Sequence, residues 1–350
     1  MSYPKVIFID TCIFDAICYN FSAATVKAFC EAVKGKKLQL LLPDPTEREI
    51  SRHINERVDM AIKTIKRAQK DAPFLIKIKN WPLIKEKNTF SLSYSMRVST
   101  HNELKKFHSL FRVKKLGYGT INMAEIMDWY DRKTPPFAEG AKRKEFPDAL
   151  AIALVRDYSN DANKVVAVIS QDNDMEKACG LYSNLFCYKS LSSFTEILQS
   201  SKNMVLQIRQ LLKKDKSKLD AAITEHFPSL SFYIEANYEG DAQDVEVEDV
   251  EFIDLSIVGI GDREVSIVFI ANVSFTAYVS YENLETAAYD SEDKVLIPYE
   301  MIEGTTHDMA HVSGIMKCKL TKDKSDFESI AMLEFDKDIV EITREPNMDY

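Results

Sequence analysis

Short uninterrupted runs of apolar residues, separated by helical patterns, constrain the fold of this chain most strongly. Such runs occupy Val6–Ile9, Leu38–Leu42 and Val165–Ile169, with a weaker fourth run at Leu185–Tyr188. Strands that are apolar on both faces are typical of a parallel sheet covered by helices on both sides. The first 200 residues therefore predict a three-layer α/β/α domain with a central, mainly parallel sheet. The helices that we expect there lie at residues 11–34, 46–71, 101–110, 121–132 and 192–199.

The rest of the chain has a different pattern. Residues 204–226 predict one helix that is charged on its outer side, and strand-like segments follow from about residue 231. Apolar and polar residues alternate clearly in Val265–Ser280, as in an antiparallel strand with one solvated face. We therefore expect a domain at residues 1–200, a linking helix at 201–230 and a smaller β-rich (α+β) accessory domain at 231–350. The other expected strands are Val250–Val258, Val312–Leu320, Ser329–Phe335 and Ile339–Ile342.

The net charge of −9 conceals a marked asymmetry along the chain. Residues 1–200 hold 31 Lys and Arg against 23 Asp and Glu, whereas residues 201–350 hold 14 against 31. Residues 51–100 carry 11 basic and 4 acidic side chains. A basic segment in an acidic protein suggests a localised anionic partner, with nucleic acid the first candidate. The alternative is a solvated helix face, since many of these basic residues fall on one expected helix.

The cysteines and the apolar runs indicate a cytoplasmic protein with no membrane partner. The six cysteines form no C-x-x-C pair and read as reduced thiols. The apolar runs fall far short of the roughly 18 residues that a membrane helix needs. Asp10 and Asp15 interrupt the apolar amino terminus before a secretory core of about 7–15 residues could form.

Acidic residues stand at the ends of two expected strands. Asp10 ends the first strand, and Asp172 follows the third. Ligands of open α/β sheets bind beyond the carboxyl ends of the strands, where two such carboxylates would repel each other unless a cation lay between them. Hard oxygen ligands suit Mg²⁺ or Mn²⁺. The alternative is that each Asp caps the helix that follows it.

A third acid follows the second strand. With Asp44 as the helix N-cap and Pro45 in the first turn, Glu47 becomes the capping-box partner, and Glu49 stays available for a metal. If Thr46 were the N-cap, Glu49 would take the capping role instead. His53 shares a helix face with Glu49, and we interpret it as a surface or supporting residue and not as a ligand.

Two more acids flank the start of the helix that leads into the third strand. Asp148 could cap that helix, whereas Glu145 precedes it and has no such structural role. The basic triplet Lys142, Arg143 and Lys144 lies just upstream, where it suits contact with phosphate.

These segments together resemble the PIN-domain nucleases, specifically the large bacterial type with an additional C-terminal domain. The resemblance covers residues 5–198. Two departures are Cys12, where many members carry Asn, and the long stretch of almost a hundred residues between Glu49 and Asp148. The matching motifs are Ile7–Cys12, Leu42–Pro43 leading to Glu49–Ile50, Lys144–Leu150 and Val168–Asp172.

The resemblance implies a divalent-metal-dependent endoribonuclease that hydrolyses single-stranded RNA with a metal-activated water. One or two Mg²⁺ or Mn²⁺ ions would shield the charge that builds up on the phosphate oxygens. A toxin, an RNA-processing enzyme and an antiviral effector fit equally. By position, the catalytic and metal-binding acids correspond to Asp10, Glu49, Asp148 and Asp172, with Glu145 and Asp174 as auxiliary acids. The expected nucleic-acid-binding residues are Arg52, Lys142, Arg143 and Lys144, and the aromatic residues of the basic segment that could stack on bases are Trp81, Phe90, Tyr94, Phe107 and Phe111.

Other functions remain open from the sequence. A catalytically silent PIN-like module could bind RNA or protein through its acidic C-terminal domain, which could also mediate homo-oligomerisation, bind a regulatory protein or mask the basic groove by mimicking nucleic acid. A haloacid-dehalogenase-type phosphatase needs a second Asp where Cys12 stands, so it ranks low. His307 and His311 have the spacing of helical metal ligands but lack the Glu of a zinc-protease motif.

Overall fold

A computed structural model describes residues 3–71, 89–137, 145–199, 202–234, 240–283, 286–290, 295–297 and 300–343. The chain forms two compact units. The first unit comprises residues 1–22 and 29–198, and the second comprises residues 23–28 and 199–350.

The first unit is built on a five-stranded parallel sheet, which confirms the predicted α/β fold. Its strands are β1 (Val6–Ile9), β2 (Gln39–Pro43), β3 (Arg112–Leu116), β4 (Val166–Ile169) and β5 (Leu185–Tyr188), in the order β3-β2-β1-β4-β5. All four residues of β1 and all four of β4 are buried, as their apolar runs require. The strand β3 was not predicted, because its sequence RVKKL is exposed and polar along one edge of the sheet.

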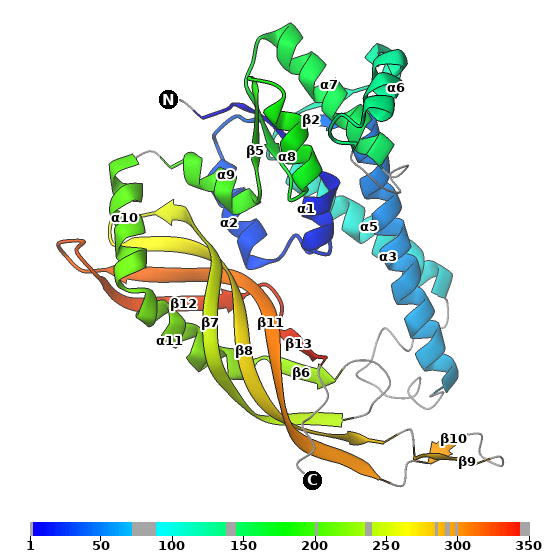
Figure 1. Cartoon of the computed structure of the whole chain (residues 1–350), viewed down its shortest axis with the longest axis vertical. Coiled ribbons are helices and arrows are strands. Elements are labelled where there is room, and N and C mark those ends of the chain that lie inside the picture. The colour runs from blue at the N-terminus through cyan, green and yellow to red at the C-terminus, as the bar shows by residue number, and fades with distance from the viewer. Residues whose placement is uncertain are drawn as a thin grey trace. The chain divides into compact units, whose positions relative to one another are not determined.

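Helices cover the sheet on both sides (Figure 1). One face packs through Val6, Phe8 and Val168 against α6 (Met123–Arg132), α7 (Phe146–Ala162) and α8 (Asn173–Gly180). Residues of the opposite face, such as Ile7 and Ile169, are also fully buried. The remaining helices of this unit are α1 (Thr11–Ala16), α3 (Asp44–Asp71), α5 (Thr89–His108) and α9 (Leu191–Ile197), with a 3₁₀ turn at Tyr118–Thr120. The helix α2 (Ala24–Val33) belongs to this unit from Phe29 onward.

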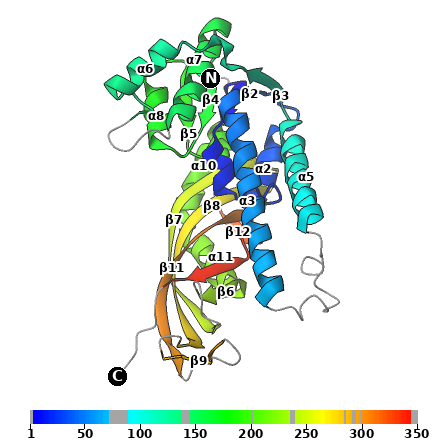
Figure 2. The same cartoon turned by 90° about the vertical axis from the view of Figure 1, so that its right-hand side faces the viewer.

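Two of the expected helices differ in the structure. The predicted helix at 11–34 is broken into α1 and α2, because Cys18 and Tyr19 adopt left-handed backbone conformations with φ of 51° and 57°. The helix expected at 101–110 starts earlier, at Thr89. It lies beside α3 over much of its length, as Figure 2 shows.

The second unit is centred on a four-stranded antiparallel sheet with strand order β12-β11-β8-β7 (Figure 1). Its long strands are β7 (Gly240–Ile260), β8 (Glu264–Glu282) and β11 (Met301–Leu320), followed by β12 (Phe327–Phe335). Alternate residues of β8 are fully buried, which confirms the predicted one-sided strand. The shorter strands are β6 (Ser231–Ile234), β9 (Ala288–Asp290), β10 (Val295–Ile297) and β13 (Ile339–Ile342).

The helix expected at 204–226 is divided into α10 (Lys202–Lys214) and α11 (Lys216–His226). The break falls at Asp215, whose Oδ2 accepts a hydrogen bond of 3.0 Å from the backbone N–H of Phe327. The His307 and His311 pair lies on strand β11, so the helical spacing of metal ligands is wrong for this segment. The His307 imidazole instead contacts Glu248 of β7, two strands away, at 3.0 Å, and the His311 imidazole contacts Asn272 of the neighbouring strand β8 at 3.1 Å.

Candidate functional site

The carboxyl ends of β1 and β4 bring Asp10 and Asp172 to the same edge of the sheet. The two strands pair in register, and the backbone N–H of Asp10 donates to the carbonyl of Ile169 at 3.0 Å. Each acid also caps the helix that follows it. Asp10 Oδ1 accepts from the N–H of Thr11 at 2.7 Å, and Asp172 Oδ1 accepts from that of Asp174 at 2.7 Å. Both residues therefore cap a helix, as the alternative interpretation predicted. They also lie at the same edge of the sheet, as the metal-site interpretation requires.

Asp10 is the most enclosed of these acids, with 6% of its surface exposed. Its second oxygen, Oδ2, accepts hydrogen bonds from Ser170 Oγ at 2.6 Å and Cys12 Sγ at 3.2 Å. Burial raises the pKa of Asp10, and these hydrogen bonds oppose the increase. Burial and the nearby Asp10 carboxyl raise the pKa of the Cys12 thiol to about 12, so this thiol stays protonated and donates. Cys12 thus supplies a hydrogen bond to the Asp10 carboxylate.

Glu49 approaches from α3 and is held on both oxygens. Thr11 Oγ1 donates to Glu49 Oε2 at 2.9 Å, and Arg52 Nη2 donates to Oε1 at 3.2 Å. The Glu49 side chain is 20% exposed. Thr11, Ser170 and Cys12 were not predicted as site residues. The only local sequence feature that could have identified these residues is their position directly after a strand, because their contacts join different elements.

Asp148 lies within the first turn of α7 and not at its N-cap, so the predicted capping alternative is wrong for this residue. Its pKa is raised to about 8, first by burial and then by the negative charges of Asp10, Glu49, Asp172 and Glu145. Carboxylates perturb one another in this way only at short range in a poorly solvated place. All four predicted acids, with Glu145, therefore share one electrostatic environment.

The auxiliary residues have different surroundings. Glu145 occupies the N-cap position of α7, but its side chain makes no capping hydrogen bond there. Asp174 Oδ1 accepts from Lys177 Nζ at 2.7 Å. The expected phosphate contacts Lys142, Arg143 and Lys144 lie outside the described residues.

The acidic cluster has the donor atoms for a divalent cation but not a preformed cation site. Within the described ranges, no three His, Cys, Asp or Glu side chains converge closely enough to hold a metal ion in their present conformations. The donor chemistry nevertheless fits, because carboxylate oxygens are the ligands that Mg²⁺ and Mn²⁺ prefer. A cation would also relieve the repulsion that raises the pKa of Asp148. Mg²⁺ and Mn²⁺ thus match the residues present.

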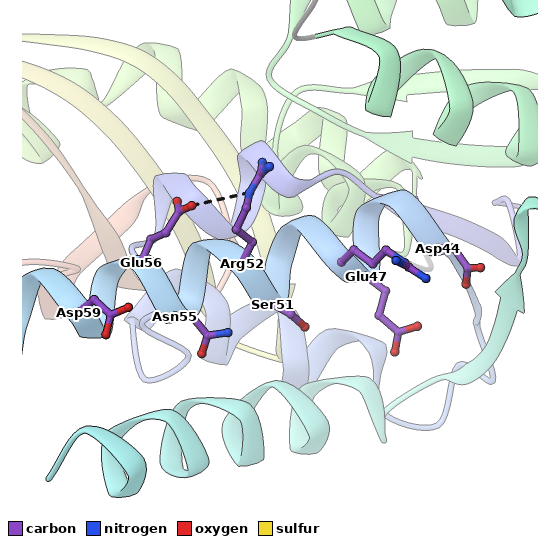
Figure 3. A pocket seen from close by; sticks show the side chains of 8 residues that line it. Asp44, Glu47, Ser51, Arg52, Asn55, Glu56 and Asp59 are labelled. Atoms are coloured by element: carbon purple, nitrogen blue, oxygen red, sulfur yellow. Dashed lines mark ion pairs between the residues drawn. The ribbon is translucent and has the colours of Figure 1, made fainter. Parts of the chain in front are cut away.

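The exposed face of α3 beside this cluster borders an open cavity of about 630 Å³. Figure 3 shows Ser51 and Asn55 pointing to one side of α3 and Arg52 and Glu56 to the other. Arg52 both lines this cavity and contacts Glu49, so it connects the acidic cluster with the cavity. The other lining residues are Asp44, Glu47, Arg48 and Asp59.

Two further expectations for this region need correction. The helix α3 begins at Asp44 itself, and Glu47 accepts hydrogen bonds from Lys115 Nζ at 2.6 and 2.7 Å, so the structure does not show the expected capping box. Phe107 and Phe111 are buried and pack with Phe29, which removes them from the candidates for base stacking. Trp81 lies outside the described residues, and of Phe90 only the backbone is described.

The first unit combines a parallel α/β sheet with acidic residues at the carboxyl edge of its strands. Residues 7–175 match the family model of the PIN domain, and this part of the chain forms a PIN domain. PIN domains are generally nucleases that bind nucleic acid and use divalent metals. Neither the curated proteins nor the solved structures contain a match to this chain. In the described parts of the chain, no helix combines the length and the apolar character that a bilayer span requires.

Proposed function

We propose that this protein is a divalent-metal-dependent endoribonuclease that acts on single-stranded RNA in the cytoplasm. Asp10, Glu49, Asp148 and Asp172 would hold one or two Mg²⁺ or Mn²⁺ ions, with Glu145 and Asp174 as auxiliary acids. The observation that carries this proposal is the pairing of β1 with β4, which end beside Asp10 and Asp172, together with the two hydrogen bonds by which Thr11 joins Asp10 to Glu49. Burial, followed by the charges of Asp10, Glu49, Asp172 and Glu145, also raises the pKa of Asp148, and perturbed groups of this kind are typical of functional sites.

The residues around the cluster have distinct roles in this proposal. When bound, the ions would activate a water molecule and shield the charge on the phosphate. Ser170 and Cys12 hold the Asp10 carboxylate by hydrogen bonds to Oδ2, and Thr11 fixes Glu49 through Oε2. These contacts restrict the carboxylates before substrate arrives, so less ordering is needed at the moment of reaction.

Basic side chains near the acids would hold the RNA backbone. Arg52 lies directly beside Glu49, and we assign Lys142, Arg143 and Lys144 the same role from their place just before α7. Phosphate contacts of this kind fix the position of a strand without reading its sequence. An exposed aromatic residue, Tyr118, lies with its ring 5.6 Å from the guanidinium of Arg48 and offers a surface for base stacking.

The decisive experiment is cleavage of a mixed pool of single-stranded RNA with Mg²⁺ or Mn²⁺ by the wild type and by Asp10→Asn. We expect cutting by the wild type and a loss of at least about a hundredfold in Asp10→Asn. Asp128→Asn is the matched control, because Asp128 is a half-exposed acid that pairs with Arg132 on α6. Equal cutting by Asp10→Asn and the wild type would refute the enzymatic proposal.

A second candidate is a silent PIN-like module that binds RNA or a protein through the acidic second unit. The capping of α1 by Asp10 and of α8 by Asp172 favours it, because both residues have structural roles without a metal. Absence of cutting by the wild type, together with measurable binding of RNA or of a protein partner, would favour this candidate.

A further inference from the structure

An imidazole on α3 makes a short contact with a carboxylate on α1, one helical turn from Glu49. His53 Nδ1 lies 2.8 Å from Asp15 Oδ2, and the two side chains are 25% and 31% exposed. A carboxylate at this distance accepts a hydrogen bond, so Nδ1 carries the proton. In the neutral imidazole, Asp15 thereby selects the tautomer whose other nitrogen, Nε2, keeps its lone pair.

The lone pair of Nε2 faces a donor that already contacts the acidic cluster. Arg52 Nη2 lies 3.4 Å from His53 Nε2 and donates to Glu49 Oε1 at 3.2 Å. A guanidinium can only donate, so the directions of all three hydrogen bonds agree. The result is a continuous relay from Asp15 through His53 and Arg52 to Glu49.

The Asp15 end of the relay is anchored by a second arginine. Arg57 Nη2 lies 3.5 Å from Asp15 Oδ1 and 3.3 Å from the backbone carbonyl of Asp15. Asp15 therefore presents Oδ1 to Arg57 and Oδ2 to His53. Arg57 can only donate hydrogen bonds, so it occupies Oδ1 of Asp15 and leaves Oδ2 to accept from His53.

Arg52 also contacts an acid outside the relay. The Arg52 side chain is 59% exposed, and its Nε also lies 3.8 Å from Glu56 Oε1 (Figure 3). Exposed ion pairs of this length are weak, and a long side chain in solvent samples several rotamers. The hydrogen bond to His53 favours the rotamer that keeps Nη2 beside Glu49.

We propose that Asp15 and His53 are positioning residues that hold the Arg52 guanidinium beside Glu49, where Arg52 binds a phosphate of single-stranded RNA. Arg52 has five N–H donors, so its contacts with His53 and Glu49 leave donors for the phosphate oxygens. The inference shares with the proposed function the assumption that the protein binds RNA. It does not assume that the protein cuts RNA, because phosphate binding precedes cutting and does not require it.

The first test measures binding of a fluorescein-labelled single-stranded RNA oligonucleotide in EDTA, where no metal-dependent cutting occurs. We expect Arg52→Ala, His53→Phe and Asp15→Asn each to weaken binding roughly three- to tenfold, and each to lower the slope of log affinity against log salt by about 1 or less. The matched control is His307→Phe, which removes a similar contact, 3.0 Å from Nδ1 to Glu248, in the second unit. We expect no change in RNA affinity there.

Asp15→Asn separates positioning from simple loss of a contact. In this variant Arg57 would hold the oxygen of the new side-chain amide, which leaves the NH₂ group facing His53 Nδ1. Nδ1 must then accept, Nε2 carries the proton, and Arg52 loses its acceptor. Selective ¹⁵N labelling of the six histidines, with His53→Phe to identify the signal, should report the Nδ1-protonated tautomer in the wild type and the other tautomer in Asp15→Asn.

Double variants complete the test. His53→Phe should have no further effect on RNA affinity once Arg52 is replaced by Ala, because His53 Nε2 lies 4.0 Å from Glu49 Oε1, beyond hydrogen-bond distance, and reaches this acid only through Arg52. Weaker binding by Arg52→Ala with unchanged binding by His53→Phe and Asp15→Asn would overturn the inference and leave the proposed function intact. An unchanged affinity of Arg52→Ala, or no RNA binding by the wild type, would also overturn it. The proposed function is judged separately, by the cleavage comparison with Asp10→Asn.

Discussion

Thr11 Oγ1 donates a hydrogen bond of 2.9 Å to Glu49 Oε2, and so ties the residue after Asp10 to a carboxylate 38 positions further along the chain. The backbone N–H of the same threonine donates to Asp10. One residue thus orients two acids of the candidate site, one through its backbone and one through its side chain. The relative position of α1 and α3 sets the geometry of this contact.

Replacement of Thr11 by Val tests this link. We expect roughly a five- to tenfold loss of RNA cleavage, because Glu49 loses the donor to one oxygen, and a loss of about 1 kcal/mol in the free energy of unfolding. Cleavage assays and urea denaturation measure the two effects. Thr64→Val is the control, since the Thr64 hydroxyl donates only to the carbonyl of Met60 in its own helix. A Thr11→Val enzyme as active as the wild type would show that this hydrogen bond does not position Glu49.

The raised pKa of Asp148 predicts a pH-dependent stability in the absence of metal. The folded-state pKa of about 8 exceeds the ordinary value of 3.8, so the folded protein binds the extra proton and stability falls as pH rises between these values. Asp148→Asn should therefore be about as stable as the wild type below about pH 4 and more stable by a few kcal/mol near pH 8. Urea denaturation in EDTA at several pH values measures this difference. A constant difference across this range would contradict the raised pKa.

Divalent cations should stabilise the folded protein in proportion to their occupancy of the acidic cluster. At a Mn²⁺ concentration of about 100 times Kd, the expected gain in unfolding free energy is about 2.7 kcal/mol. Thermal denaturation with and without Mn²⁺ should show a higher Tm for the wild type and for Asp128→Asn, whose substituted acid lies on α6. The same increase in Asp172→Asn would place the bound ion elsewhere.

Gly314 on β11 should tolerate no side chain. A Cβ added there would overlap the carbonyl oxygen of Glu334 and lie 2.8 Å from the ring of Phe269, both inside the packed sheet of the second unit. Gly314→Ala should cost about 2–4 kcal/mol through overpacking. Gly180→Ala is the control, because its Cβ would meet nothing within 4 Å, and we expect a change below about 1 kcal/mol. Similar stabilities of the two variants, measured by chemical denaturation, would disprove this packing argument.

Much of the fold was predictable because local pattern and burial agree. The apolar runs at Val6–Ile9 and Leu185–Tyr188 form β1 and β5 with the expected bounds, and Ile339–Ile342 forms β13. The edge strand β3 was missed, since Arg112–Leu116 carries no apolar pattern and is a strand only because it pairs with β2. A short polar sequence of this kind does not indicate that it pairs with a distant segment.

The helix breaks show the same limit. The apolar spacing of residues 11–34 is helical throughout, yet the chain turns at Cys18 and Tyr19, and this turn lets Phe14 and Phe21 pack against Phe107 of α5. At Asp215 the break is matched by a hydrogen bond to Phe327, more than a hundred residues away. Tertiary contacts outweighed helical periodicity at both places.

The sequence by itself determined the α/β character of the first part, the one-sided strands of the second, and the four acids worth examining. Those acids were identifiable because each stands directly after a buried strand or near the start of a helix, where local pattern fixes the place. The tertiary structure decided which side chains hold them. Direct hydrogen bonds to the acids come from Ser170, Thr11 and Cys12, and the Asp15–His53 pair reaches Glu49 through Arg52. Contacts between separate elements depend on packing and not on local sequence.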